Sequence, residues 1–564
     1  MGTRVLIVQE DLAAAQELVS QLQTEATDFD FIAAENTSMT LAQHTASAAA
    51  HANDPLWRAA EFIPLAGENL TAVRIVANSI NDIVQQVALP GVTMIANLDL
   101  GARDPVTGGF DLTPLPKAQT IAASATRVVA DSLAELATIN RSQTIGPVSA
   151  AVDKLDTLLT KASAPLASAS NLLSIAGSAL GEDGARTYLL AFLNNAETTA
   201  LGGTAASLSV ITADQGSVEI TDQSSSADLL NVDPVDVVVD QSALGLYSPY
   251  LVTHSNTATS RPDFPTAGQI LKAHYQRDRG INVDGVISVD PLALSYMLKA
   301  TGPITLSTGD VLSSDNAVSL LLNGVYFRWD SFKEQKKVDA FFAGAASAIF
   351  EKIRSGDFNI GEMTKAIGKG VDQGSIMAWF ADPAEQSMLD NTRVQGSLPK
   401  TNEAQTVIGT YFRDVSGSKI DYYLETSTTT TSDVCSAPLN PTFTTSVTLH
   451  SNLTVEQAND LPAYVRSTNW GAEKFATQVW VYGPVGAKLT DVVVESQGIE
   501  TQIASSAFDL GRPVAAFMVL LRPGETSTVS AAFTGAEGAY GPLEVRGTPM
   551  INATNSTLDQ PGCG

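Results

Sequence analysis

The sequence contains little cysteine, with Cys435 and Cys563 the two thiols in 564 residues. Two cysteines are too few for a disulfide-rich scaffold, and they lack the C-x-x-C spacing of a zinc site. We expect them to form a single long-range disulfide that holds the C-terminal tail. Such a bond would indicate an oxidising, extracytoplasmic compartment. Two unrelated thiols in a reduced protein are the alternative.

Basic residues are also scarce. The chain has 33 Lys and Arg against 60 Asp and Glu, which gives a formal net charge of −27. A surface with this excess of negative charge repels a phosphate backbone, so nucleic acid is not an expected partner. The apolar content of 44% is nevertheless sufficient for folded cores, and the length predicts several domains.

Long apolar runs and common catalytic motifs are missing as well. No stretch reaches the roughly 18 to 20 apolar residues that span a bilayer, and the chain enters "RVLIVQEDLAAAQELVSQLQ" at Arg4 without a signal-peptide pattern. We expect a signal or membrane anchor before Arg4 in the natural chain, and hence a cell-surface protein. Without a G-x-S-x-G, Walker, Rossmann or H-E-x-x-H motif, nucleotide hydrolysis, hydride transfer and zinc-protease chemistry have no support, and we expect no cofactor or metal.

The composition changes twice along the chain, which predicts a multidomain α+β protein. Residues 1–178 carry apolar side chains at helical spacing, as in "LTAVRIVANSINDIVQQV", and predict a helical stalk or bundle. Within this region, "DPLWRAAEFIPLAGENL" predicts a packed helix corner with Trp57, Phe62 and Leu65 as apolar anchors.

Residues 179–398 predict an α/β/α sandwich. Short apolar runs such as "RTYLLAFLNN", "VDVVVDQS" and "DGVISVD" alternate there with helical patterns such as "TAGQILKAHYQRD". In residues 399–564 helices are expected to disappear, and runs such as "TQVWVYGP" predict an immunoglobulin-like β-sandwich, with Trp480 and Tyr482 on one face and in its core. A carbohydrate-binding module and a brace on the α/β domain are the two roles that fit this sandwich.

Two long strings in the middle of the chain resemble a known family. They are "ARTYLLAFLNNAETTALGGTAASLSVITADQGSVEI" and "RPDFPTAGQILKAHYQRDRGINVDGVISVDPLALSYMLKATGPITL". Both resemble an actinobacterial cell-surface family called domain of unknown function 4012. The helix corner and the C-terminal β region resemble it too, so the resemblance covers nearly the whole chain. Members usually carry an N-terminal membrane anchor.

A more distant similarity is to LytR-CpsA-Psr proteins, which transfer glycopolymers from a polyprenyl diphosphate carrier to the cell wall. It rests on the order of an "NN...GG" turn, a strand pair and the "VDGVISVD" block. The similarity implies arginines and Mg²⁺ around a diphosphate. Arg261, Arg277 and Arg279 are available for this, although Thr199 occupies a position where family members commonly have arginine.

Carboxylates near turns are the candidate catalytic groups. Glu197 follows a predicted strand, Asp263 lies in "RPDFP", and Asp290 ends "DGVISVD". Two carboxylates across a sugar suffice to cleave or transfer a glycosidic bond, one as acid and the other as base or nucleophile. Turn formation and helix capping are the structural alternative for each of them.

The candidate substrate-binding residues have amide, charged or phenol groups that suit sugar hydroxyls and ring faces. They are Asn194, Asn195, Arg261, Arg277, Arg279, Asp284 and Tyr275. The sequence therefore predicts a cell-surface enzyme that cleaves or transfers glycosidic bonds of an envelope polysaccharide, and the family resemblance suggests a furanose-rich arabinan or galactan. A LytR-CpsA-Psr-like phosphotransferase with Mg²⁺ and a non-catalytic surface scaffold or glycan-binding protein are the alternatives.

Overall fold

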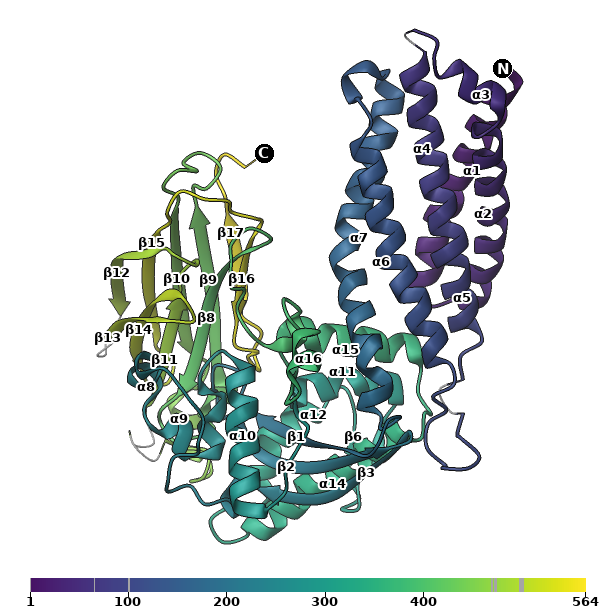
Figure 1. Ribbon diagram of the computed structural model, residues 1–564. Helices are drawn as coiled ribbons and strands as arrows, with labels where there is room; N and C mark the ends of the chain where they lie inside the picture. Colours follow the sequence, from purple (N-terminus) through teal and green to yellow (C-terminus); the bar gives the residue numbers. More distant parts are fainter. Residues whose placement is uncertain are drawn as a thin grey trace. The chain divides into compact units, whose positions relative to one another are not determined.

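The computed structural model describes residues 2–64, 66–99, 102–467, 470, 474–496 and 502–563. The chain is a multidomain protein of mixed α/β structure, as predicted. It divides into two compact units (Figure 1). One unit comprises residues 1–185 with 213–217, and the other comprises residues 186–212 with 218–564.

The N-terminal unit is helical. Its elements are α1 (Gly2–Thr27), α2 (Phe31–Ala52), α3 (Pro55–Ala60), α4 (Gly67–Ile83), a π-helical segment (Val84–Ala88), α5 (Leu89–Ala96), α6 (Leu115–Ala137) and α7 (Gly146–Ala179). Helices α4, α6 and α7 share a core that includes Ile75, Val129 and Val152, which follow from the apolar spacing of the sequence. No helix in the described residues is long and apolar enough to cross a membrane.

The expected helix corner is only partly packed. Trp57 is 1% exposed, and its Nε1 donates to the Leu70 carbonyl at 3.0 Å. Phe62, in contrast, is 88% exposed, so its expected role as an anchor is wrong. The reason is that α3 ends at Ala60, so Phe62 lies in the turn beyond the helix. Leu65 lies outside the described residues.

The second unit begins with a mixed sheet of strand order β3-β2-β1-β4-β7. Its strands are β1 (Arg186–Asn194), β2 (Thr204–Asp214), β3 (Ser217–Ser225), β4 (Gly285–Val289) and β7 (Ile376–Phe380). Alternate residues of β1 point to opposite faces: Leu189 and Ala191 pack with α10 (Phe264–Arg279), whereas Leu190 and Phe192 pack toward α11 (Pro291–Thr301) and α14 (Gln335–Arg354). Helices therefore cover both faces.

Shorter elements connect these strands and helices. They are α8 (Gln241–Tyr247), α9 (Tyr250–Thr253), β5 (Ile304–Thr305), β6 (Val311–Leu312), α12 (Ala317–Ser319), α13 (Val325–Arg328), α15 (Ile360–Gln373) and α16 (Pro383–Ser387). The strand predicted at "VDVVVDQS" is wrong, because residues 235–240 are irregular. The Val235 N–H donates to the Val252 carbonyl at 3.0 Å, and Val238 is 97% exposed. This run therefore pairs with a helix end and not with the sheet.

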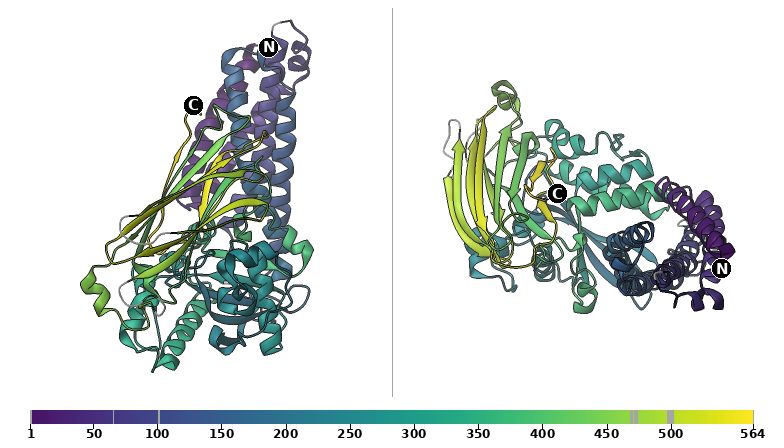
Figure 2. Two further views of the ribbon diagram at one scale, coloured as in Figure 1. Left: turned by 90° about the vertical axis from the view of Figure 1, so that its left-hand side faces the viewer. Right: turned by 90° about the horizontal axis from the view of Figure 1, so that it is seen from above.

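Residues 406–559 contain two further sheets. Their strands are β8 (Thr406–Asp414), β9 (Leu424–Ser432), β10 (Thr442–Ser451), β11 (Phe475–Tyr482), β12 (Lys488–Ser496), β13 (Gln502–Asp509), β14 (Arg512–Leu521), β15 (Thr526–Thr534), β16 (Leu543–Gly547) and β17 (Asn555–Asp559). Within the described residues the strand orders are β12-β15-β10-β9-β17 and β13-β14-β11-β8-β16. The sheets face each other across a shared apolar core (Figure 2).

Two details of this two-sheet region bear on the predictions. Trp480 and Tyr482 share one face and are fully buried, but they do not lie in the core between the two sheets. They lie in one apolar cluster with Tyr247 of α8, whereas Val479 and Val481 on the opposite face of β11 belong to the core between the sheets. Helices do not disappear entirely, because α17 (Val455–Asp460) forms behind a capping box of Thr454 and Gln457. The T-x-x-Q pattern that predicts such a cap is present in the sequence.

Candidate functional site

The second unit contains a cavity of about 460 Å³. Its floor is formed by the turn after β1 and by the loop between β8 and β9, its wall by α14, and its rim by the end of β3. The side chains that carry its chemistry are Asn194, Glu197, Asp228, Tyr326, Asp339, Lys419 and Tyr464. The cavity therefore combines segments that lie between residues 192 and 464 of this unit.

An ion pair between Glu197 and Lys419 lies at the floor of the cavity. Lys419 is 4% exposed and Glu197 is 28% exposed, and Glu197 also accepts a hydrogen bond from Thr204. Burial by itself lowers the pKa of Lys419, but Glu197, Tyr326 and Tyr464 outweigh this effect and raise that pKa above its ordinary value. Lys419 thus stays charged and presents an ion-paired Glu197 to the cavity.

Two tyrosines surround the lysine. The Lys419 Nζ atom lies 4.9 Å from the ring centroids of both Tyr326 and Tyr464, which is within the range of cation–π attraction. Asn194 donates from Nδ2 to the Tyr326 hydroxyl at 3.0 Å. These contacts fix the position of the ammonium group.

The loop that carries Lys419 is shaped by Asp414. The Asp414 carboxylate accepts from the Ser416 N–H at 2.7 Å and from the Ser418 N–H at 2.9 Å. Burial raises the pKa of Asp414, and the combination of burial with the nearby Asp414 raises the pKa of Asp421 well above its usual range. Asp414 therefore holds the backbone of this loop in place, while Glu197, Tyr326 and Tyr464 act on the charge of Lys419 itself.

Two more carboxyl groups lie at the rim. Asp228 ends a short 3₁₀ segment (Ser226–Asp228) and accepts from the Ser225 N–H at 2.7 Å. Asp339 projects from α14. Reduced hydration of its carboxyl group and the nearby Asp228 carboxylate raise the pKa of Asp339. The rim thus offers a carboxyl group that retains its proton to a higher pH than an ordinary aspartate.

Most of the wall is apolar. It comes from one face of α14 and from the neighbouring helices, with Leu294, Leu321, Leu322, Val338, Phe342, Ala345, Ala346 and Ile349 among its members. Polar groups are concentrated at the floor and at the rim, where Gln223, Ser224, Asn256, Ser331 and Gln335 lie. A ligand of this cavity would therefore meet donors and acceptors at its two ends.

Asp263 and Asp290 are not among the described residues that line the cavity. Asp290 caps α11 by accepting from the Ala293 N–H at 2.9 Å, and it accepts from Asn195 Nδ2 at 2.9 Å. Burial raises the pKa of Asp290 to about 6. Asp263 accepts from Ser397 Oγ at 2.7 Å and from the Thr266 hydroxyl. Of the predicted site residues, the cavity lining includes Asn194 and Glu197.

The remaining predicted binding residues are engaged in other contacts. Arg261 forms two hydrogen bonds with Asp509, Arg277 pairs with Asp278, and Arg279 pairs with Asp222 at 2.7 Å. The Tyr275 hydroxyl donates to Asp222 at 2.8 Å, and Asp284 accepts from the Thr187 N–H at 2.8 Å. The arginines that a diphosphate would require are thus distributed over several ion pairs. In the described part of the chain, no group of three or more His, Cys, Asp or Glu side chains is arranged to hold a metal ion.

Several cavity residues were not predicted from the sequence. Asp228, Tyr326 and Asp339 lie in the predicted α/β/α region, and Lys419 and Tyr464 lie in the predicted C-terminal sandwich. The one local signal is "DVSGSKIDYY", in which Ser and Gly indicate a turn around Lys419. Nothing in that pattern identifies Glu197 as the partner.

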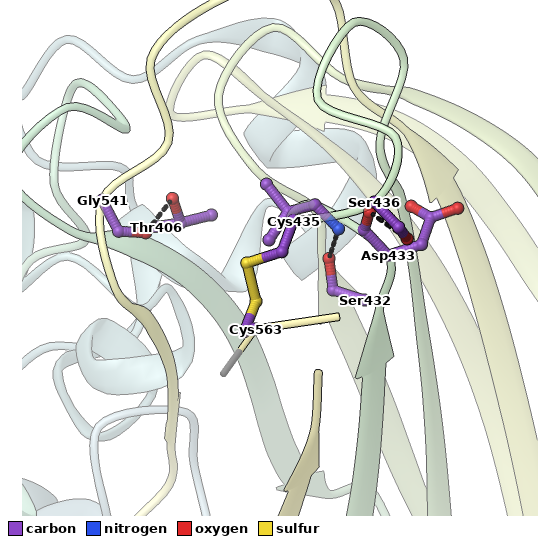
Figure 3. The surroundings of a disulfide bond; sticks show 8 residues. Thr406, Ser432, Asp433, Cys435, Ser436, Gly541 and Cys563 are labelled. Atoms are coloured by element: carbon purple, nitrogen blue, oxygen red, sulfur yellow. Dashed lines mark hydrogen bonds between the residues drawn. A yellow bond between two sulfur atoms is a disulfide. The ribbon is translucent and has the colours of Figure 1, made fainter. Parts of the chain in front are cut away.

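The C-terminal tail is held by a disulfide between Cys435 and Cys563, the pairing that the sequence predicts (Figure 3). Their Cα atoms lie 5.3 Å apart, across a sequence separation of 128 residues. Strand β17 lies just before Cys563 and pairs in parallel with β9. The tail is therefore joined to the two-sheet region by both a covalent bond and a strand pairing.

Comparisons with known proteins give a family match for the middle of the chain. No curated protein matches it. Among solved structures, protein gbs0355 from Streptococcus agalactiae is similar, with 12% identity over 39% of this chain and 77% of that chain, at a TM-score of 0.26. This likeness carries no argument about function. Residues 183–326 match the family described as "Protein of unknown function (DUF4012)", which confirms the predicted resemblance for this part of the chain. The resemblance of the helix corner and of the C-terminal β region to the same family stays a prediction.

Proposed function

We propose that the protein is a glycan-active enzyme that cleaves or transfers glycosidic bonds in the cavity above Glu197. The observation that supports this most directly is that two carboxyl groups in different surroundings line one cavity. Glu197 is ion-paired with the buried Lys419, whereas the pKa of Asp339 is raised by reduced hydration and by Asp228. Carboxyl groups whose environments differ in this way typically divide the roles of acid and base.

Each carboxyl group then has a defined role. Asp339 donates its proton to the glycosidic oxygen as the bond from that oxygen to the anomeric carbon breaks. Glu197 either removes a proton from the water or sugar hydroxyl that attacks the anomeric carbon, or attacks that carbon itself before the sugar is transferred. The amide of Asn194 and the hydroxyl groups of Ser224 and Ser225 supply hydrogen bonds to sugar hydroxyls.

The substrate that we propose is an envelope polysaccharide, with a furanose-rich arabinan or galactan the first to test. The proposed location is the cell surface. The Cys435–Cys563 disulfide supports it, because disulfides persist mainly in oxidising compartments. The net charge of −27 fits an uncharged glycan better than a polyanion.

Finer assignments of the fold belong to the same proposal. We propose that residues 179–398 form an α/β/α sandwich similar to that of LytR-CpsA-Psr proteins, since helices cover both faces of the β3-β2-β1-β4-β7 sheet. Residues 399–564 would form an immunoglobulin-like sandwich, supported by the two facing sheets. The Lys419 loop would make this sandwich part of the reaction site and more than a brace.

A second candidate function is phosphotransfer from a lipid diphosphate. The apolar wall formed by α14 favours it, because a prenyl chain would be buried there. The engagement of Arg261, Arg277 and Arg279 in ion pairs counts against it. Strict dependence on a divalent ion and on a lipid-linked donor would identify this activity. A non-catalytic scaffold would bind glycan without producing any new species.

The test is incubation of the protein with envelope polysaccharides, followed by mass analysis of the soluble products. We expect oligosaccharides of linear or cyclised mass that form equally well with EDTA. Glu197→Gln and Asp339→Asn should each reduce the rate by about 10² to 10⁴-fold, the usual contribution of a general acid or base. Asp263→Asn is the matched control, because Asp263 contacts Thr266 and Ser397 outside the cavity. Loss of activity in the control alone would return the catalytic assignment to Asp263.

A further inference from the structure

An exposed aromatic side chain lies beside the cavity. Phe332 is 62% exposed and lies in the short connection between α13 and α14. Its ring meets the ring of Tyr464 edge to face, with centroids 5.1 Å apart and an interplanar angle of 78°. Tyr464 is half-buried and lines the cavity. The two rings therefore form a continuous aromatic surface that leads from the cavity floor toward solvent.

A buried hydroxyl group without a partner lies at the same place. Ser331 precedes Phe332, lines the cavity and is 4% exposed. Its Oγ atom has no hydrogen-bond partner among the described residues, and the same holds for Asn256 Oδ1, which also belongs to the cavity lining. Buried polar atoms in folded proteins are nearly always hydrogen-bonded. These two atoms therefore leave hydrogen-bonding capacity in the cavity lining that a bound water or a hydroxyl group of a ligand would satisfy.

We infer that Tyr464, Phe332 and Ser331 form a second sugar-binding subsite at the mouth of the cavity. The inference rests on the proposed function, because it assigns the next sugar unit of the same polysaccharide chain. The C–H face of this unit stacks on the exposed ring of Phe332, the nearly perpendicular ring of Tyr464 contacts it from the side, and one of its hydroxyl groups bonds to Ser331 Oγ. A chain bound in this way extends beyond Glu197 in at least one direction, so the enzyme prefers long oligosaccharides.

The surroundings of Phe332 favour a sugar over a lipid chain. Next to the ring lie Asp330 and Lys333, which form an ion pair at 2.8 Å and are 41% and 82% exposed. Gln335 follows at the rim of the cavity. A single aromatic ring among polar side chains matches the alternating apolar and hydroxyl surface of a sugar ring. A prenyl chain would require continuous apolar surface.

The subsite is tested by comparing long and short oligosaccharides of the envelope polysaccharide. Phe332→Ala should weaken binding of long fragments roughly five- to tenfold, the loss of one aromatic stacking contact, and leave short fragments unaffected. Binding is measured by calorimetry in a Glu197→Gln background, and KM in the otherwise unaltered enzyme. Ser331→Ala should produce a smaller loss in the same direction. Phe508→Ala is the matched control, because Phe508 is 58% exposed on β13, outside the cavity lining.

Three outcomes would overturn the inference. The first is that the protein cleaves the polysaccharide but Phe332→Ala and Phe508→Ala bind long fragments with equal affinity. This outcome would leave the proposed function intact. The second is weakened binding of a long-chain prenyl phosphate in place of the glycan, which would assign the surface to a lipid. The third is the absence of both binding and products with the unaltered protein, which would overturn the proposed function as well.

Discussion

Two ion pairs join the middle of the chain to its C-terminal strands, and they differ in what they face. In the first pair, Arg261 and Asp509 are 7% and 0% exposed. In the second pair, Lys419 is 4% exposed, but its partner Glu197 is 28% exposed and lines the cavity. Each pair links a residue before position 399 to a residue after it. The first pair is enclosed by protein, whereas the second is open to the cavity.

The Arg261–Asp509 pair is enclosed in a hydrogen-bond network. Asp509 also accepts from the Tyr482 hydroxyl at 2.8 Å, and Tyr482 contacts the Tyr247 hydroxyl. Burial of this cluster raises the pKa of both tyrosines well above the ordinary value. None of these four side chains is among the described residues that line the cavity. The network therefore joins β13 and β11 to the region around α10.

The Lys419–Glu197 pair uses the same kind of charge differently. Its lysine is held by Tyr326 and Tyr464, and its carboxylate remains accessible from the cavity. Enclosure thus distinguishes an ion pair that stabilises the fold from one that presents a charge to a ligand. Four substitutions, in order of decreasing effect, test this distinction.

Removal of the enclosed cation has the largest expected effect on stability. Arg261→Met leaves Asp509 buried without its cation, and breaking such a pair costs about 3 to 5 kcal/mol of unfolding free energy. Urea denaturation followed by circular dichroism measures this cost. A loss below about 1 kcal/mol would show that the network is open to water. It would contradict the distinction between an enclosed and an open ion pair.

Asp290 shows what burial does to a carboxyl group that is held by amides. Because its folded pKa is about 6 against about 3.9 in an unfolded chain, the folded state binds the extra proton. The stabilisation is therefore complete at low pH and is lost as the pH rises through 6. Between pH 4 and pH 7, the stability of Asp290→Asn should gain about 2 to 3 kcal/mol relative to the unaltered protein. A constant difference across this range would contradict the raised pKa of this buried carboxyl group.

The open pair should lose less stability and more function. Lys419→Met leaves a Glu197 that water can reach through the cavity, so we expect a stability loss of about 2 kcal/mol, below that of the enclosed pair. The rate of glycan cleavage should decrease about 10- to 100-fold with a shifted pH profile, because the charge that fixes Glu197 is gone. Lys419→Arg should recover part of the rate. An unchanged pH profile would reduce Lys419 to a purely structural role.

The smallest effect should come from one hydroxyl group of the enclosed network. Tyr482→Phe removes the hydrogen bond to Asp509 while the ring stays packed, so we expect a stability loss of about 1 to 2 kcal/mol. Thermal unfolding of this variant, compared with Tyr411→Phe on the adjacent strand β8, measures it. Glycan cleavage per folded molecule should be unchanged, and a loss of cleavage would connect the two ion pairs.

The sequence predicted elements better than it predicted their meeting points. Periodicity located β1, α10 and α11, because alternation and helical spacing are local properties. It failed at "VDVVVDQS", where the apolar residues met no partner strand, and at Phe62, where the helix ended too early. Both errors concern tertiary context, which a local pattern does not contain.

The candidate site shows the same division. Glu197 was predicted from its place after a strand and before a glycine turn, a local signal. Its partner Lys419 is 222 residues away in sequence, and Asp339 looks like an ordinary exposed helix residue. Arg277 and Arg279 at the end of α10 were predicted to bind a ligand, but each forms an ion pair with an aspartate. The partner of Arg279, Asp222, is distant in sequence, so this pairing depends on the tertiary fold.

The most direct measurement of the central claim is mass analysis of envelope polysaccharide incubated with the unaltered protein and with Glu197→Gln, each with and without EDTA. The account predicts new oligosaccharides from the unaltered protein in both conditions, and at least a hundredfold fewer from Glu197→Gln. Equal product from the two proteins, or products that require a divalent ion and a lipid-linked donor, would contradict it.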